Sequence, residues 1–98
     1  MSDIIWKSIC EEADHLVSND RLKQYGHPLD TFTDIGKVWG MILNTDPIPP
    51  EIVGLMMAGL KLCRQKFLPK RDNLVDLAGY AKSIDLVLEE KQRRKLYE

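Results

Sequence analysis

The sequence predicts an all-α protein: a compact bundle of about four helices with a long C-terminal helix. Three observations support this. Apolar residues recur every three to four positions in four stretches. The segments between these stretches are rich in Gly, Pro, Asn and Asp. No stretch alternates apolar and polar residues as a strand does. The 98 residues fit one domain, with a core at about 3–90 and a solvated, frayed tail at 91–98.

The first helix is predicted to start at the cap residue Ser2 and to run to about Val17. Its apolar residues share one face of a helical wheel, and Glu12 sits at the border of that face. The segment Ser18 to Pro28 is expected to be a polar connection, since its Gly-His-Pro sequence ends a helix and proline suits the start of the next.

The second helix is predicted from Pro28 to about Leu43, followed by a rigid, proline-rich turn from Asn44 to Pro50. The third helix, Pro50 to about Lys66, is apolar around most of its circumference, so it is expected to lie centrally with contacts on several sides. Its narrow polar strip consists of Glu51, Lys61 and Gln65, with Gly54 and Ala58 between them.

The fourth helix is predicted to start near Arg71 and to run past Glu90. Its main apolar face consists of Leu74, Leu77, Ala78, Ala81, Ile84 and Leu88. The opposite face carries Asp72, Asp76, Gly79 and Ser83, and small residues there let another helix or a flat ligand approach closely. This second face therefore indicates either a subunit interface, as in a homodimer or larger homo-oligomer, or a binding cleft.

Composition narrows the possible functions. With 14 basic and 15 acidic residues, the net charge of -1 argues against a nucleic-acid partner. The two cysteines, Cys10 and Cys63, lie in apolar patterns without metal-ligand spacing and are expected to be buried free thiols. No signal-peptide pattern and no membrane-spanning run is present, so a cytoplasmic location is expected, with no membrane partner.

Asp72 and Asp76 are the first candidates for chemistry. Four residues apart on one helix, they face the same way, and their repulsion suggests a role such as holding a divalent cation. Mg²⁺ favours carboxylate oxygens. The alternative is structural, because Asp72 or Asn73 can cap the helix while Asp76 favours its positive end.

The segment from Asp20 to Asp30 is the second candidate. Arg21 and Lys23 are cationic donors, Tyr25 is an aromatic ring and His27 an imidazole, which together suit phosphates and a stacked base. Surface loops often carry such residues without a ligand, so that interpretation stays open.

Two further cations, Lys61 and Arg64, project from the apolar third helix. Lys61 lies on the narrow polar strip of that helix, where its ammonium group can enter a crevice. Alternatively, it is a lysine that extends to water near the C-terminal end of the helix.

The motifs resemble those of a family of small phage and prophage proteins without assigned biochemistry. The resemblance covers roughly residues 8 to 88 and rests on separated motifs in the same order. They are Asp20-Arg21-x-x-x-Tyr25-Gly26-His27-Pro28-x-Asp30-x-Phe32, a Pro-Glu helix start with Met-Met and Lys61-x-x-Arg64, and Arg71-Asp72-Asn73-x-x-Asp76-x-Ala78-Gly79-Tyr80. If phage-encoded, the protein is expected in the host cytoplasm.

A more distant resemblance is to the MazG-like all-α nucleoside triphosphate pyrophosphatases. Those enzymes form oligomeric helical bundles and hold Mg²⁺ with helix-borne carboxylates. The resemblance implies a nucleotide pyrophosphohydrolase with Asp72 and Asp76 as catalytic metal ligands and Glu12 as a further metal ligand. The chain departs from the pattern of these enzymes because its third helix has Glu51 and then Gly54 in place of a first acidic pair.

With this function, a nucleotide-binding set is expected around these carboxylates. Its members are Arg21, Lys23, Tyr25, His27, Lys61, Arg64, Arg71, Asn73 and Tyr80. Two alternatives to an enzyme remain. One is a non-catalytic protein that sequesters a host nucleotide signal, as an anti-defence protein does. The other is a small adaptor that binds a host protein.

Overall fold

The computed structural model describes residues 8–95 and confirms the all-α prediction. Its elements are α1 (Ile9–His15), the π-helical turn η1 (Leu16–Arg21), α2 (Leu22–Tyr25), α3 (Pro28–Leu43), α4 (Pro50–Phe67) and α5 (Arg71–Arg94). Because α1, η1 and α2 follow one another without a break, these described residues form four helical segments and contain no strand.

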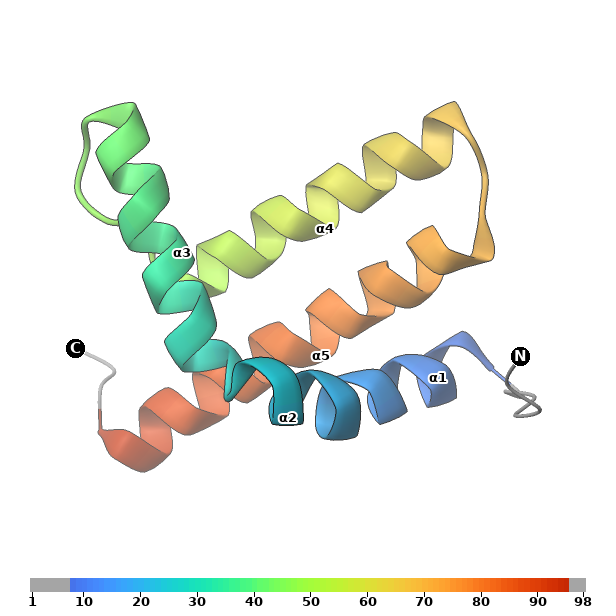
Figure 1. Cartoon of the computed structure of the whole chain (residues 1–98), viewed down its shortest axis with the longest axis horizontal. Coiled ribbons are helices and arrows are strands. Elements are labelled where there is room, and N and C mark those ends of the chain that lie inside the picture. Colours follow the sequence, from blue (N-terminus) through green and yellow to red (C-terminus); the bar gives the residue numbers. More distant parts are fainter. Residues whose placement is uncertain (1–7, 96–98) are drawn as a thin grey trace.

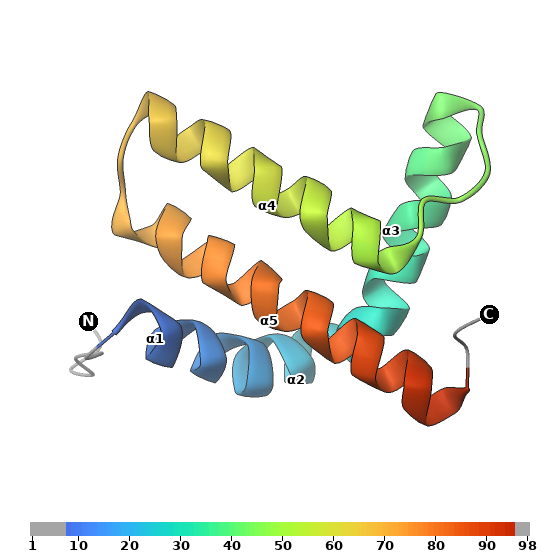
Figure 2. The same cartoon turned by 180° about the vertical axis from the view of Figure 1, so that it is seen from behind.

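The helix α5 lies at the centre of this arrangement. It runs between α4 on one side and the α1–η1–α2 segment on the other (Figure 1). The helix α3 crosses one end of this layer and projects away from it, as the view from behind also shows (Figure 2). The radius of gyration is 14.5 Å, somewhat above the roughly 13 Å typical of a chain of about 100 residues, as expected for a projecting helix.

The first helical segment begins at Ser8, whose hydroxyl oxygen accepts the Glu11 N–H at 3.0 Å. The predicted cap at Ser2 lies outside the described residues. The prediction that Ser18 to Pro28 forms a connection was wrong for residues 18–25, which are helical. The continued helix lets Leu22 and Tyr25 line a cavity together with residues of α3 and α5. The segment ends at Gly26, whose φ of 79° favours glycine.

The helix α3 begins and ends as predicted, at Pro28 and Leu43. Asn44 closes it in the left-handed conformation, with φ of 60°. The proline-rich turn then folds back against α3, since the Ile48 N–H donates to the Gly36 carbonyl oxygen at 3.0 Å. A Cβ on Gly36 would lie only 2.0 Å from the Ile48 carbonyl oxygen, so this close approach requires glycine.

The prediction that the apolar third helix lies centrally was wrong. Helix α4 packs on α5 through its polar strip: Lys91 Nζ donates to Glu51 at 2.7 Å, and Lys61 Nζ lies 2.8 Å from an Asp76 oxygen. Gly54 lets the two helices come close, because a Cβ there would lie 2.4 Å from Ile84 Cγ1. The apolar circumference of α4 therefore remains largely uncovered, with Leu55 56% exposed.

Helix α5 buries its small and polar face within the chain. Val75, Ser83 and Val87 are buried, whereas Leu88 from the predicted main apolar face is exposed. Gly79 admits Val17 of η1, whose Cγ2 would lie 3.5 Å from an added Cβ. The face that was expected to meet a second subunit or to form a cleft is thus packed partly against the first helical segment.

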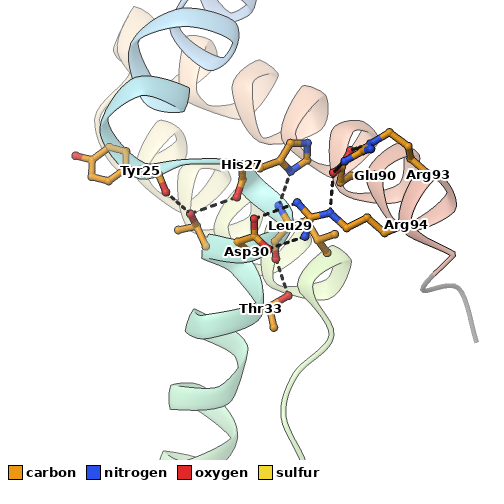
Figure 3. A network of polar contacts seen from close by, with 9 residues as sticks. Tyr25, His27, Leu29, Asp30, Thr33, Glu90, Arg93 and Arg94 are labelled. Atoms are coloured by element: carbon orange, nitrogen blue, oxygen red, sulfur yellow. Dashed lines mark hydrogen bonds and ion pairs between the residues drawn. The ribbon is translucent and has the colours of Figure 1, made fainter.

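The C-terminal turns of α5 are ordered by charge (Figure 3). The Glu90 carboxylate accepts hydrogen bonds from Arg93 and Arg94, and Arg94 also donates to Asp30 of α3 at 2.8 Å. The prediction of a frayed tail from residue 91 was therefore wrong for residues 91–94, which are helical. Residues 96–98 lie outside the described part.

The buried core is small. Leu29, Phe32, Val53 and Val87 form it where α3, α4 and α5 meet. Cys10 and Cys63 are free thiols but exposed, so the prediction that they are buried was wrong. Within residues 8–95, no helix is both long and apolar enough to cross a membrane.

Candidate functional site

A cavity of about 230 Å³ lies between the α1–η1–α2 segment, α3 and α5. Its wall is mainly apolar and includes three aromatic rings. We call it the inner pocket; its lining residues are Ala13, Leu16, Val17, Arg21, Leu22, Tyr25, Gly26, Pro28, Thr31, Phe32, Ile35, Met57, Asp76, Gly79, Tyr80 and Ser83. An apolar pocket with a few convergent polar groups is the usual form of a small-molecule site.

The local structure explains why this space exists. The π-helical turn η1 is wider than an α-helical turn, and such turns occur frequently at functional sites. It carries Leu16, Val17 and Arg21 past the small residues Gly79 and Ser83 of α5. Tyr80 closes the other side, with its ring centroid 6.5 Å from that of Phe32.

Three charged groups meet beside the inner pocket. One carboxylate oxygen of Asp76 in α5 forms an ion pair with Lys61 Nζ of α4 at 2.8 Å. The other oxygen lies 3.9 Å from Arg21 Nη2 of η1. The Lys61 side chain is only 14% exposed, whereas that of Arg21 is 51% exposed. The Lys61 ammonium group therefore lies in a crevice, as one of the two interpretations predicted, and does not extend into water. Arg21 can turn toward a ligand at little cost.

A second, broader hollow of about 570 Å³ lies where α4 ends and α5 begins. Four charged residues of the predicted site line this outer hollow. They are the cations Lys61 and Arg64 and the acids Asp72 and Asp76. Asp76 lines both hollows, so the Lys61–Asp76 pair separates the inner pocket from the outer hollow.

The predicted carboxylate triad is not assembled in the part of the chain that the structure describes. Glu12 faces Arg71, with its oxygen 3.7 Å from an Arg71 nitrogen, while Asp76 is paired with Lys61. No group of three or more His, Cys, Asp or Glu side chains within residues 8–95 is arranged to hold a metal ion. Of the three predicted metal ligands, Asp72 and Asp76 line the outer hollow.

Neither Asp72 nor Asn73 caps α5, because its N-cap is Lys70 and no side-chain hydrogen bond is made there. Asp72 lies in the first turn of α5, where the helix dipole favours a carboxylate. Asn73 instead holds the α4–α5 turn, donating to the Gln65 side chain at 3.2 Å and to the Leu68 carbonyl oxygen at 3.3 Å.

Two residues of the Asp20–Asp30 segment that were predicted to bind a ligand, His27 and Lys23, do not line the inner pocket. The Nδ1 atom of His27 accepts the Leu29 N–H at 3.0 Å, so the ring caps α3 (Figure 3). Lys23 is exposed and lines neither hollow. Arg21 and Tyr25, by contrast, both line the inner pocket.

A model of a protein family described as "Domain of unknown function (DUF6378)" matches residues 8–86 of this chain. The chain belongs to this family. All the site residues predicted from the sequence fall within the segment that matches DUF6378, as does the lining of both hollows. The Glu90–Arg93–Arg94 cluster lies beyond it.

Two curated phage proteins are similar to this DUF6378 chain. The Gene 55 protein of Mycobacterium phage D29 is 35% identical over 85 residues, which is 86% of this chain and 56% of that protein. The Gene 55 protein of Mycobacterium phage L5 is 32% identical over 77 residues, 76% of this chain and 48% of that protein. The chain thus spans about half the length of these relatives. No solved structure matches it significantly.

Several pocket residues of this DUF6378 domain were not foreseen. Leu16, Leu22 and Met57 were assigned to helix faces or to a connection, yet they line the inner pocket. The signal that pointed toward them was the Gly79–Ser83 stripe, which marks where α5 leaves room for another element.

Proposed function

We propose that this phage-type DUF6378 protein binds a nucleotide, with the base in the inner pocket and the phosphates at the cations beside Asp76. The observation that carries this proposal is the position of Arg21 and Lys61 at the edge of an aromatic-lined pocket. Planar bases stack on aromatic rings, and guanidinium and ammonium groups bind phosphates.

The size of the pocket supports a ring system as its occupant. Its volume of about 230 Å³ is below the roughly 300–1,000 Å³ typical of pockets that enclose a drug-sized ligand. A single base fits this description, while the sugar and phosphates of a nucleotide extend outward. Tyr25 stands at the exposed side, 65% accessible, where it can cover a base.

Binding without turnover is the form of this function that the charges favour. Glu12 and Asp76, two of the three proposed metal ligands, already face Arg71 and Lys61. A protein that binds a nucleotide without cleaving it sequesters that nucleotide, which is one way for a phage to blunt a nucleotide signal of its host.

Arg21 and Lys23 provide a matched test, because both are exposed cations near the end of the same helical segment. We expect Arg21→Ala to weaken nucleotide binding by about 10-fold or more, the effect of losing a charge-assisted hydrogen bond. Lys23→Ala should change it less than about two-fold, since Lys23 lines neither hollow.

The measurement is isothermal titration calorimetry, preceded by a thermal-shift screen of nucleoside mono-, di- and triphosphates with and without Mg²⁺. Stabilisation that needs no Mg²⁺, and that is lost in the Arg21→Ala variant alone, supports the binder. If no nucleotide raises the melting temperature, or if both variants bind as the wild type does, the proposal is wrong.

A second candidate is Mg²⁺-dependent cleavage of a nucleoside triphosphate to a monophosphate and pyrophosphate. The shared position of Asp72 and Asp76 in the outer hollow, with Lys61 and Arg64 beside them, favours it. Carboxylates and substrate phosphates together are the usual ligands of Mg²⁺ in such reactions. The assay is pyrophosphate release with and without Mg²⁺. Activity that Asp72→Asn and Asp76→Asn each reduce at least 10-fold would establish it over the binder.

A further inference from the structure

The most apolar side of α4 faces away from the rest of the chain. Its large side chains on that side are between 40% and 90% exposed. We call this surface the outer α4 face; it consists of Ile52, Leu55, Met56, Gly59, Leu60, Leu62, Cys63 and Phe67. A Cβ added at Gly59 would meet no atom within 4 Å, which shows that the middle of this face is open. Neither view shows another helix covering it (Figures 1 and 2).

This exposure is unusual, since amphipathic helices normally turn their apolar side toward the core. Here α4 turns Glu51, Gly54 and Lys61 toward α5 and leaves its leucines in water. A second apolar group lies at the projecting end of α3, where Val38, Met41, Ile42 and Leu43 are all about half exposed or more. Soluble monomers rarely expose contiguous apolar surface beyond a few hundred Å².

The exposed area is about what a stable dimer needs. A fully exposed large aliphatic side chain presents roughly 100 Å², and a phenylalanine roughly 200 Å². The six exposed large side chains of the outer α4 face therefore contribute on the order of 400 Å². A standard interface buries about 800 Å² per partner, of which about 65% is apolar in homodimers, or roughly 500 Å².

We infer that a second copy of this chain covers the outer α4 face, with the two α4 helices antiparallel and crossing near Gly59. Gly59 lies seven residues after Ile52 and eight before Phe67, so it marks the middle of the face. A two-fold axis at this point makes the surface self-complementary. The missing Cβ also lets the two backbones approach closely.

Charge is consistent with self-association. Lys66 is the charged residue on this side of α4, and in an antiparallel pair the two copies of Lys66 lie far apart, near opposite ends of the contact. The inferred interface does not involve the inner pocket, whose contribution from α4 is Met57. It borders the outer hollow, which Cys63 and Phe67 also line.

The first test is mass in solution by sedimentation equilibrium. The wild type is expected at about twice 11.3 kDa. Leu55→Glu and Met56→Glu should each give a monomer with unchanged helical circular dichroism. Leu88→Glu, at an exposed leucine of α5, is the matched control and should stay dimeric. A wild-type monomer at 100 μM overturns the inference, even if a host protein added to it binds the same face.

The second test locates the crossing point by cross-linking. Cys63 lies four residues past Gly59, so the two copies of Cys63 should be roughly 12 Å apart along the helices. That separation excludes a direct disulfide but suits a bismaleimide of similar length. The Cys10→Ser protein, whose outer α4 face is unchanged, is expected to give cross-linked dimer. The same protein with Leu55→Glu added should give none. A dimer that forms without this cross-link overturns the antiparallel contact at Gly59.

Discussion

At the scale of single residues, the chemical groups that could bind a ligand were easier to predict than the role of each group in the structure. Arg21, Tyr25 and Tyr80 were selected as ligand-binding side chains and do line the inner pocket. His27 and Asn73 were selected for the same reasons, yet their polar atoms hold backbone groups of their neighbours. A sequence shows which donors and acceptors are present, but whether a backbone group reaches them first depends on the turn that the chain makes.

Glu90 provides a prediction about acid stability. The hydrogen bonds from Arg93 and then Arg94 lower the pKa of Glu90 from 4.5 to about 2. Because the pKa of Glu90 in the folded state lies below its ordinary value, the interaction of Glu90 with the two arginines stabilises the fold above about pH 4.5. This contribution is lost as the pH falls from 4.5 toward 2.

Glu90→Gln should therefore lower the urea midpoint at pH 7 and should flatten its dependence on pH between 4.5 and 2. Glu89→Gln, which changes an exposed neighbour, is the control and should keep the wild-type profile. The same pH dependence in Glu90→Gln and in the wild type would contradict the prediction.

Gly36 allows a test of the turn after α3. Alanine there places its Cβ 2.0 Å from the Ile48 carbonyl oxygen, so the turn has to move. We expect Gly36→Ala to lower the free energy of unfolding by about 1–3 kcal/mol, in spite of the better helix propensity of alanine. Lys37→Ala, at the exposed next position, should have little effect. Denaturant titration of both variants makes the comparison.

At the scale of helices, the periodic pattern predicted where they lie but not which side they bury. The ranges of α3, α4 and α5 agree with the prediction, and α5 extends to Arg94. The faces of α4 and α5 are opposite to the expectation, because Gly54 and two ion pairs let these helices pack closely through their less apolar sides. Hydrophobicity alone cannot reveal this choice, since it contains no information about the partner of each face.

The polar contact between α4 and α5 can be measured with a double-mutant cycle. Lys61 and Asp76 are 14% and 26% exposed, and we expect a coupling free energy of about 1 kcal/mol between Lys61→Met and Asp76→Asn. The pair Lys82–Asp14 is the control, because its atoms lie at a similar 2.6 Å but its Asp14 side chain is 62% exposed. Its coupling should be smaller; an equal coupling in the two pairs would contradict the role of burial.

At the scale of the whole molecule, the small buried core and the exposed outer α4 face point the same way. A fold that leaves so much apolar surface in water gains stability when that surface is covered. If the second copy supplies the cover, the melting temperature of the wild type should rise with protein concentration. That of Leu55→Glu should not. Differential scanning fluorimetry from 1 to 100 μM tests this, and a concentration-independent wild-type value would argue against the dimer.

The long-range bond from Arg94 to Asp30 bears on the order in which the chain folds. The α4–α5 hairpin is closed by a short turn, so its contacts are local and can form early. Arg94 and Asp30 are 64 positions apart in sequence, and their bond requires α3 to be in place already. Losing it in Arg94→Ala should therefore accelerate unfolding and leave the folding rate nearly unchanged. The Arg94–Asp30 bond thus governs the lifetime of the folded state, not the rate at which that state forms.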